Sequence, residues 1–210
     1  MMDIRKVPNV LTVIRAILVP VFMVLVIFPI VPGEIALRFV SAFLFLAIAL
    51  TDMLDGKIAR KYNAVSDFGK FLDPIADKLL VMGGMLALVI FYMQRHNATF
   101  AILIAFSLFV VMVRELAVTS LRLICKNTGG KVIAANMAGK VKTVSQIVFI
   151  IAALIETPLF NFIADLTGLE FLTGSLWVSY TALAVMTFMT IYSGIQYFVL
   201  YLPALKDKKD

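Results

Sequence analysis

The sequence is poor in cysteine, histidine and charge. Cys125 is its only cysteine and His96 its only histidine, so no disulfide can form within the chain. We expect Cys125 to be a small packing residue near a helix end and His96 to be solvated in a short loop. Only 15% of the residues are charged, whereas 62% are hydrophobic. A soluble domain of this length could not bury so much apolar surface, so lipid must cover part of it.

Six apolar segments are long enough to cross a membrane as helices, each of which needs about 20 mostly apolar residues. Short breaks such as Pro32-Gly33 and Gly129-Gly130 separate them, without a low-complexity tract or a soluble domain. The first segment is longer than the apolar core of a signal peptide, so we expect it to be retained. We predict one all-α integral membrane domain over residues 1–210, with six transmembrane helices at roughly 10–31, 35–60, 68–93, 98–125, 140–157 and 175–201.

The basic residues predict how these helices are oriented. One face of the membrane receives only Arg38, Arg95 and His96, and its longest predicted loop, 158–174, has no lysine or arginine. The positive-inside rule therefore predicts a plasma-membrane protein whose N- and C-termini are cytoplasmic. The net charge of +6 then reflects cytoplasmic loops near anionic lipid. The sequence has no basic stripe with interleaved aromatic residues, so we do not expect it to bind nucleic acid. The basic residues assigned to the cytoplasmic face are Arg5, Lys6, Lys57, Arg60, Lys61, Lys70, Lys126, Lys131, Lys140, Lys142, Lys206, Lys208 and Lys209.

Four aspartates lie near the cytoplasmic ends of the second and third predicted helices. Helical spacing makes Asp52 a neighbour of Asp55, and Asp73 a neighbour of Asp77. The connection 61–67 is short, so the two helices should be antiparallel neighbours and the four carboxylates should converge. Carboxylates at such short distances repel one another. Bound cations are therefore needed to keep all four ionised. The alternative is that they form surface ion pairs with basic neighbours, which are Lys57, Arg60, Lys70 and Lys78.

An all-carboxylate site suits hard divalent cations such as Mg²⁺, Mn²⁺ or Ca²⁺. Two ions about 3.5–4 Å apart are a common arrangement for displacement at phosphorus. Gly56, Ala59 and Gly69 lie beside the aspartates and would let a charged ligand approach the backbone, although such spacing is also common in ordinary helix packing. Arg60 offers a guanidinium fork to a phosphate. We predict a site for two Mg²⁺ or Mn²⁺ ions at the cytoplasmic membrane face.

Residues 52–60 read DMLDGKIAR, eight residues follow, and residues 69–77 read GKFLDPIAD. This pattern resembles the signature of the CDP-alcohol phosphatidyltransferase family, D-x-x-D-G-x-x-A-R, eight or nine residues, G-x-x-x-D-x-x-x-D, at every fixed position. The six-helix layout resembles that family over essentially the whole chain. The resemblance implies a metal-dependent membrane transferase of phospholipid biosynthesis. It also implies a homodimer in which each site forms within one protomer.

The same resemblance implies roles for individual residues. Asp77, the last aspartate of the motif, would be the general base. The implied metal ligands are Asp52, Asp55, Asp73 and Asp77. The residues implied to line the CDP-diacylglycerol site are Gly56, Ala59, Arg60 and Gly69. Asn9, Thr12 and Arg15 share the start of the first helix. All three either contact the nucleotide, or cap the helix and reach the interface.

Weaker motifs indicate which family members the chain is most similar to. They read PNVLTVIR (8–15), RE (114–115), GKVIAA (130–135), GKVKT (139–143) and YSG (192–194). They resemble the members whose acceptor is glycerol 3-phosphate. The implied reaction transfers the phosphatidyl group from CDP-diacylglycerol to glycerol 3-phosphate, which releases CMP and forms phosphatidylglycerol phosphate.

A second group of residues favours an acceptor that carries a phosphate. Arg114 lies deepest in the predicted membrane, where an arginine should face protein, water or a phosphate. Several cationic donors beside the metals suit a phosphate better than they suit serine, choline or free inositol. The alternative is that these residues are topology signals or lipid head-group contacts. The candidate acceptor-phosphate residues are Arg114, Arg122, Lys131, Lys140, Lys142 and Thr143.

Other functions remain open at the level of sequence. A transferase of the same family could use an inositol phosphate or phosphatidylglycerol as its acceptor. A cation transporter would distribute its carboxylates through the depth of the membrane, whereas here they cluster at one face. A non-catalytic lipid-binding protein gives no reason for four aspartates with adjacent glycines.

Overall fold

The computed structural model describes residues 7–28, 34–61, 67–127 and 137–206. Within these ranges the side chains of residues 7–9, 34, 52–61, 67–71, 73, 126–127 and 202–206 lie outside the description. The described chain forms six α-helices and one short 3₁₀ helix, which is the expected all-helical architecture. They are α1 (Val7–Ile27), α2 (Glu34–Lys61), α3 (Asp67–Gln94), α4 (Ala98–Asn127), α5 (Met137–Thr167), η2 (Glu170–Leu172) and α6 (Trp177–Lys206).

The helices have the length and composition of membrane spans. Among the described residues, five helices are long and apolar enough to cross a bilayer, and the part of α2 from Ile35 to Thr51 is a shorter apolar helix. The bilayer core contains no water to pair with backbone N–H and C=O groups. An α-helix pairs these groups within its own segment, so it can cross the membrane alone. The architecture is that of a multi-pass membrane protein. The remainder of the second predicted span continues as helix to Lys61, with side chains outside the description.

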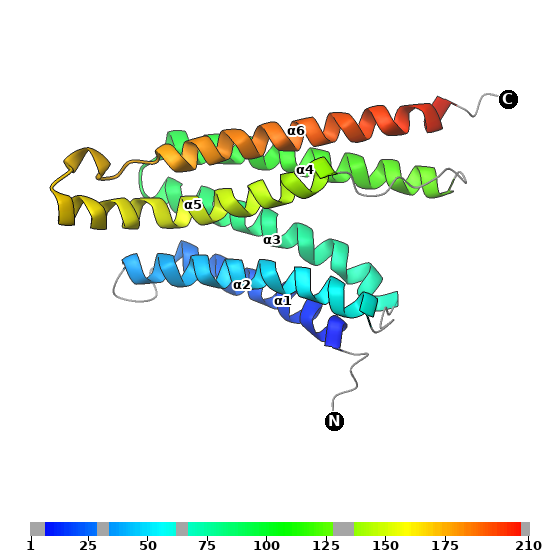
Figure 1. The fold of residues 1–210 in the computed structure, drawn as a ribbon, viewed down its shortest axis with the longest axis horizontal. Coiled ribbons are helices and arrows are strands. Elements are labelled where there is room, and N and C mark those ends of the chain that lie inside the picture. The colour runs from blue at the N-terminus through cyan, green and yellow to red at the C-terminus, as the bar shows by residue number, and fades with distance from the viewer. Residues whose placement is uncertain (1–6, 29–33, 62–66, 128–136, 207–210) are drawn as a thin grey trace.

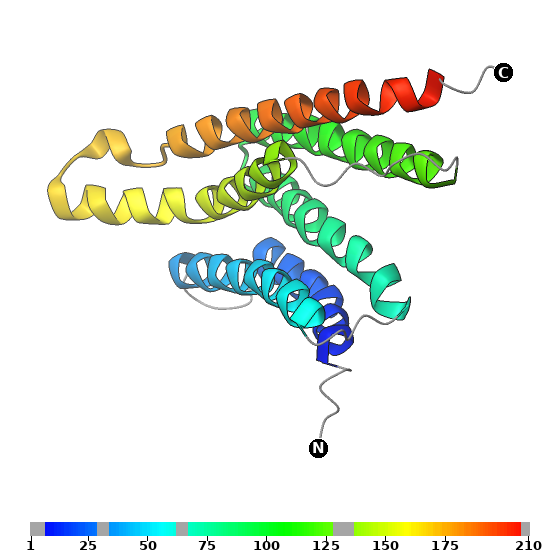
Figure 2. The same ribbon diagram turned by 45° about the vertical axis from the view of Figure 1, so that its right-hand side comes forward.

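The six helices run up and down, so that alternate helix ends lie at the same end of the molecule (Figure 1). We call the end that holds the start of α1, the end of α2 and the start of α3 the N-terminal end. α6 packs against both α4 and α5, and α3 crosses from these helices toward α1 and α2 (Figures 1 and 2). α1 contacts both α2 and α3, and α2 also contacts α3, so the two helices that carry the aspartate motif are neighbours.

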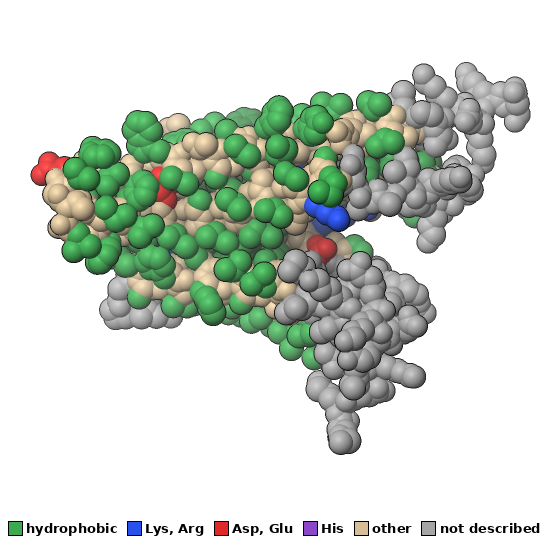
Figure 3. Space-filling view, viewed as in Figure 1, with side chains coloured by type: hydrophobic (Ala, Val, Ile, Leu, Met, Phe, Trp, Pro, Cys, Tyr) green, Lys and Arg blue, Asp and Glu red, His purple; other side chains and the backbone are tan. Residues whose placement is uncertain are grey.

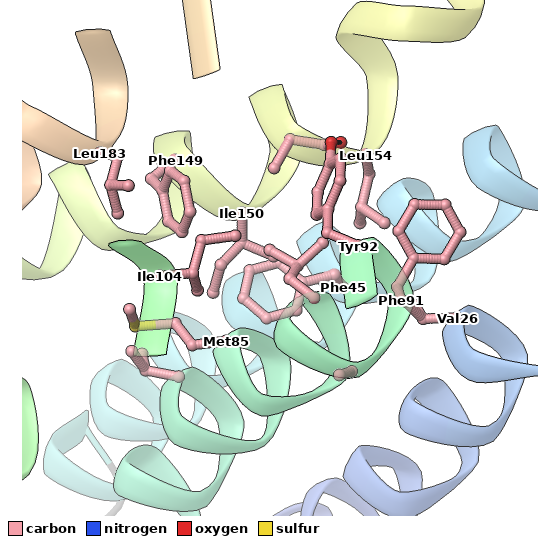
Figure 4. Packing of buried hydrophobic residues seen from close by; sticks show 14 of the residues in the cluster. Val26, Phe45, Met85, Phe91, Tyr92, Ile104, Phe149, Ile150, Leu154 and Leu183 are labelled. Atoms are coloured by element: carbon pink, nitrogen blue, oxygen red, sulfur yellow. Dashed lines mark hydrogen bonds between the residues drawn. The ribbon is translucent and has the colours of Figure 1, made fainter. Parts of the chain in front are cut away.

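Two consecutive glycines place α3 at the centre of the packing. A Cβ atom on Gly83 would lie 2.8 Å from Val19 of α1, and one on Gly84 would lie 3.0 Å from Phe45 of α2 and from Ile150 of α5. The absence of side chains lets α3 approach these helices closely. The surrounding core contains residues of all six helices, and Figure 4 shows those that pack around this region.

α5 is longer than the sequence analysis predicted. The predicted segment ended at residue 157 and was followed by a loop, 158–174, but the helix continues through Pro158 to Thr167. A membrane helix tolerates proline when neighbouring groups satisfy the freed backbone. Nearby on the same helix, the Ala153 carbonyl accepts a hydrogen bond of 2.7 Å from the Tyr92 hydroxyl of α3. The helix ends instead at Gly168, whose φ of +73° is the left-handed conformation that commonly stops a helix.

A buried carboxylate fixes the start of α6 against α5. Glu156 is 4% exposed, and its carboxylate accepts hydrogen bonds from the backbone N–H groups of Val178 and Ser179, both at 2.7 Å. The Ser179 hydroxyl donates to the same carboxylate. The first N–H groups of a helix have no partner within it, so a carboxylate there satisfies them and interacts favourably with the helix dipole. Glu156 therefore acts as a cap supplied by a neighbouring helix.

We expect Glu156→Ala to lower the free energy of unfolding by about 1–3 kcal/mol, because it leaves buried N–H donors without an acceptor. Thermal denaturation of the purified protein in detergent would show this as a lower Tm. Glu170→Ala is the matched control, since Glu170 is exposed in η2 and should leave the Tm unchanged. An equal Tm for Glu156→Ala and the wild type would contradict the capping role.

Candidate active site

A cavity with charged side chains in its lining opens between α3, α4 and α5. Its volume is about 510 Å³, and the residues that line it include Asp77 and Lys78 of α3, Arg114 of α4 and Lys142 of α5. The start of α3, the end of α4 and the start of α5 all lie at the N-terminal end of the bundle (Figure 1). In the space-filling view, basic and acidic side chains lie on either side of a notch, and hydrophobic side chains cover much of the described face (Figure 3). The cavity therefore combines access to water with walls buried among membrane helices.

Asp77 is held by an arginine from α1. Its side chain is 52% exposed, and its Oδ1 atom accepts a hydrogen bond at 3.2 Å from Nη1 of Arg15, which is only 1% exposed. A buried guanidinium that reaches an exposed carboxylate fixes where that carboxylate lies. Arg15 thus connects α1 to the wall of the cavity that α3 forms.

Where α4 and α5 line the cavity, one carboxylate links two cationic side chains. Glu115 Oε1 accepts a hydrogen bond from Arg114 Nη1 at 2.8 Å and another from the Lys142 ammonium. The three side chains are largely buried, at 11% exposure for Arg114, 15% for Glu115 and 8% for Lys142. Each buried charge has an opposite charge beside it, as burial in a membrane protein requires. Together Arg114, Glu115 and Lys142, which we call the triad, carry one net positive charge.

Arg122 and Arg114 both pack on one aromatic ring. The Tyr197 ring of α6 lies 5.0 Å from the Arg122 guanidinium and 5.3 Å from that of Arg114, and Arg122 donates a hydrogen bond of 2.8 Å to the Tyr197 hydroxyl. Cation–π contacts of this kind stabilise a desolvated guanidinium and fix its orientation. Arg114 and Arg122 each retain a buried Nε atom without a hydrogen-bond partner in the described part of the chain.

The described lining of the cavity carries four basic and two acidic side chains. The basic ones are Lys78, Arg114, Arg122 and Lys142, and the acidic ones are Asp77 and Glu115. Lys78 is oriented by Thr119, whose hydroxyl accepts a hydrogen bond from it at 2.7 Å. A cavity with this excess of cations attracts anions. Phosphate is a suitable ligand because guanidinium and ammonium groups both bind it well.

The structure brings four of the candidate acceptor residues to one place. Arg114, Arg122, Lys142 and Thr143 line the cavity that contains Asp77. Lys140 is exposed on the first turn of α5 and is not among the described lining residues. Thr12 is buried on α1, close to Arg15 in the sequence. Lys131 lies outside the described residues, as do the side chains of Asn9, Asp52, Asp55, Ala59, Arg60 and Asp73 and the surroundings of Gly56 and Gly69.

Sequence reasoning did not assign Arg15, Lys78, Gln146 or Tyr197 to the site. The sequence left open whether Arg15, with Asn9 and Thr12, contacts the nucleotide or reaches the interface, and it did not predict the contact with Asp77. Gln146 lies one helical turn after Lys142, so the helical period alone places it on the same face. Tyr197 had no signal in the sequence, because its place beside Arg114 depends on how α6 packs against α4.

The donor chemistry of the aspartate motif fits a divalent metal. Asp77 presents a half-exposed carboxylate at the cavity, and hard ions such as Mg²⁺ and Mn²⁺ prefer oxygen ligands. Within the described side chains alone, no three carboxylate, histidine or cysteine groups form a metal cluster. The other three motif aspartates belong to α2 and to the start of α3, with side chains outside the description.

Comparisons with known proteins identify the family of the chain. The family model for CDP-alcohol phosphatidyltransferases matches residues 5–202. A CDP-diacylglycerol–glycerol-3-phosphate 3-phosphatidyltransferase of Bacillus subtilis is 38% identical over 95% of this chain and 96% of its own length. Proteins of the same name from Escherichia coli K12 and Salmonella paratyphi A are 31% and 32% identical, over 91% of this chain and 92% of theirs. Because the match covers nearly all of both chains, the protein belongs to the CDP-alcohol phosphatidyltransferase family.

Proposed function

We propose that the protein is a CDP-diacylglycerol–glycerol-3-phosphate 3-phosphatidyltransferase. It transfers the phosphatidyl group of CDP-diacylglycerol to glycerol 3-phosphate, releases CMP and forms phosphatidylglycerol phosphate. The relatives that carry this name align with almost the whole chain. The observation that carries the proposal is the cavity that Asp77 and a cluster of cations line together, because this reaction needs a base for a hydroxyl and a binding site for a phosphate.

The cationic wall is the site for the acceptor phosphate. Arg114 and Lys142 are already neutralised in part by Glu115, and the triad keeps one positive charge. Arg122 adds a second guanidinium, held by Tyr197. A phosphate dianion would gain charge-assisted hydrogen bonds from these groups, whereas an uncharged alcohol would leave them without a ligand. This is why we favour glycerol 3-phosphate over the uncharged and amino alcohols.

Asp77 is the general base. Its carboxylate accepts the proton of the acceptor C1 hydroxyl as that oxygen attacks the β-phosphorus of CDP-diacylglycerol and the bond to CMP breaks. Arg15 orients the carboxylate through the bond to its Oδ1 atom. Divalent ions, Mg²⁺ or Mn²⁺, would be held by Asp52, Asp55, Asp73 and Asp77 and would neutralise charge on the diphosphate. The contribution of the protein is mainly to position the substrates and to stabilise their charge, as in other phosphoryl transfers.

The position of the cavity suits a lipid substrate and a water-soluble acceptor. Its lining combines charged groups with apolar residues such as Val81, Val111 and Ile147. The acyl chains would remain in lipid while the acceptor enters from water. The distribution of lysine and arginine supports cytoplasmic termini and a cytoplasmic site in the plasma membrane. We further propose a homodimer with one complete site in each protomer, as the family resemblance implies.

Gly194 of α6 supports the position of Arg114. A Cβ atom there would lie 3.1 Å from the Cγ atom of Arg114, so the arginine would have to move by a few tenths of an ångström. We expect Gly194→Ala to raise the KM for glycerol 3-phosphate about two- to fivefold, because a displaced group binds its ligand less well. The control is Gly139→Ala, whose Cβ would meet Tyr197 at an ordinary 3.5 Å. Equal kinetics for the two variants would contradict this role for Gly194.

The proposed function is tested by CMP release from CDP-diacylglycerol with a panel of acceptors. We expect release with glycerol 3-phosphate, and much less with serine, inositol phosphate or phosphatidylglycerol. Release should require Mg²⁺ or Mn²⁺ and should stop in excess chelator. Faster release with inositol phosphate or phosphatidylglycerol would assign the other acceptor, and full turnover in chelator would remove the metal site from the account.

A further inference from the structure

Gln146 presents an unused hydrogen-bond donor at the cavity. The side chain is 1% exposed and belongs to the lining that also contains Asp77 and Lys142. Its Nε2 atom has no hydrogen-bond partner among the residues that the structure describes. Buried polar groups in native proteins are nearly always paired, so an unpaired donor at a binding cavity needs an explanation, and a bound substrate supplies one. The amide therefore points to a substrate group that is a hydrogen-bond acceptor.

The position of Gln146 limits which group this is. It lies four residues after Lys142 on α5, so the two side chains share a helix face and their backbones are about 6 Å apart along the axis. Lys142 belongs to the triad with Arg114 and Glu115, where we place the acceptor phosphate. A three-carbon phosphate bound there is long enough to reach the next turn of the helix. Gln146 is thus one turn further into the helix bundle than the phosphate site.

The chemistry of the amide indicates a neutral oxygen. Gln146 carries no charge, and apolar side chains such as Val111 and Ile147 line the same cavity. A second phosphate would be poorly solvated beside an amide and aliphatic groups, whereas a hydroxyl needs only one donor and one acceptor. Glycerol 3-phosphate has one hydroxyl that neither reacts nor carries the phosphate, at C2. The reacting C1 hydroxyl is already assigned to Asp77.

We infer that Gln146 is a specificity-determining residue that donates a hydrogen bond from Nε2 to the C2 hydroxyl of the acceptor. This inference rests on the proposed function and goes beyond it, because it explains how the site recognises the glycerol part of the acceptor. A site built to bind a hydroxyl discriminates against an analogue that lacks it, since its own polar group then remains unpaired.

The test compares two acceptors in the wild type and in Gln146→Met, which keeps the side-chain length and removes the amide. The second acceptor is 3-hydroxypropyl phosphate, which has the reacting hydroxyl and the phosphate but no C2 hydroxyl. We expect the wild type to prefer glycerol 3-phosphate about tenfold in kcat/KM, and Gln146→Met to lose most of that preference. The loss should come from slower use of glycerol 3-phosphate, with the analogue changed less than about twofold.

A merely structural role would lower kcat/KM for both acceptors equally, and that result would overturn the inference. Gln146→Leu is a second apolar variant, and the Tm of each variant shows whether it folds. Val148→Met is the matched control, because Val148 of the same helix is 52% exposed and is not among the residues that line the cavity, so it should keep the wild-type preference.

Two further results separate this inference from its alternatives. The expected effect of Gln146→Met is the same with CDP-dialkylglycerol as with CDP-diacylglycerol. An effect that disappears with the ether lipid would assign the amide to an ester carbonyl of the lipid and overturn the hydroxyl assignment. If the wild type releases no CMP with glycerol 3-phosphate, the proposed function fails; if it releases CMP without preferring either acceptor, only the role of Gln146 fails.

Discussion

Asp77→Asn should abolish almost all turnover, with kcat reduced about 10²–10⁴-fold, the usual contribution of a general base. The substitution keeps the size of the side chain and an oxygen that can accept from Arg15, so the contact between α1 and α3 can persist. It removes the charge that takes the proton of the acceptor hydroxyl and that would bind a metal. The measurement is CMP release at saturating CDP-diacylglycerol and glycerol 3-phosphate.

Asp165→Asn is the matched control for this experiment. Asp165 is an exposed aspartate near the end of α5, at the opposite end of the bundle from the cavity (Figure 1). It should retain the kcat of the wild type. A rate of CMP release near the wild-type value for Asp77→Asn would show that another group is the base.

Arg114→Ala should raise the KM for glycerol 3-phosphate about 10- to 100-fold while the KM for CDP-diacylglycerol changes much less. The range corresponds to the loss of one charge-assisted hydrogen bond, about 1.5–3 kcal/mol. The substitution also leaves Glu115 with Lys142 as its remaining partner in the triad, which reduces the positive charge available to the phosphate. Initial rates measured while one substrate is varied at saturating concentrations of the other separate the two KM values.

Arg95→Ala is a suitable control, because Arg95 is an exposed arginine that also lies over an aromatic ring, 4.8 Å from the centroid of Phe91. It follows α3 at the end far from Asp77 and should leave both KM values unchanged. If Arg114→Ala raised the KM of the lipid as much as that of glycerol 3-phosphate, Arg114 would not belong to the acceptor site.

Much of the helical architecture can be predicted because long apolar segments in a membrane have few alternatives to helix. Each of the six predicted segments lies largely within one helix of the structure. The main error was the end of α5, where Pro158 was taken as the start of a loop. A proline stops a helix less reliably in a membrane, and the stop signal was Gly168, ten residues later.

The candidate site was predictable where its residues carry charge at helical spacing. Arg114 and Arg122 share a helix face, and both line the cavity with Lys142 and Asp77. The residues that orient them depend on contacts between helices that are distant in the sequence. Arg15 and Asp77 are 62 positions apart, and Arg122 and Tyr197 are 75 apart, so the local pattern contains no information about either pair.

The most direct test of the proposed transfer uses glycerol 3-phosphate with ¹⁸O in its C1 hydroxyl. The purified protein in detergent is supplied with CDP-diacylglycerol and the metal, and both products are analysed by mass spectrometry. If the acceptor hydroxyl attacks the phosphatidyl phosphorus, the label is found entirely in phosphatidylglycerol phosphate and the CMP is unlabelled. Label attached to the cytidine product, or release of phosphatidic acid without a labelled lipid, would contradict the reaction proposed for this cavity.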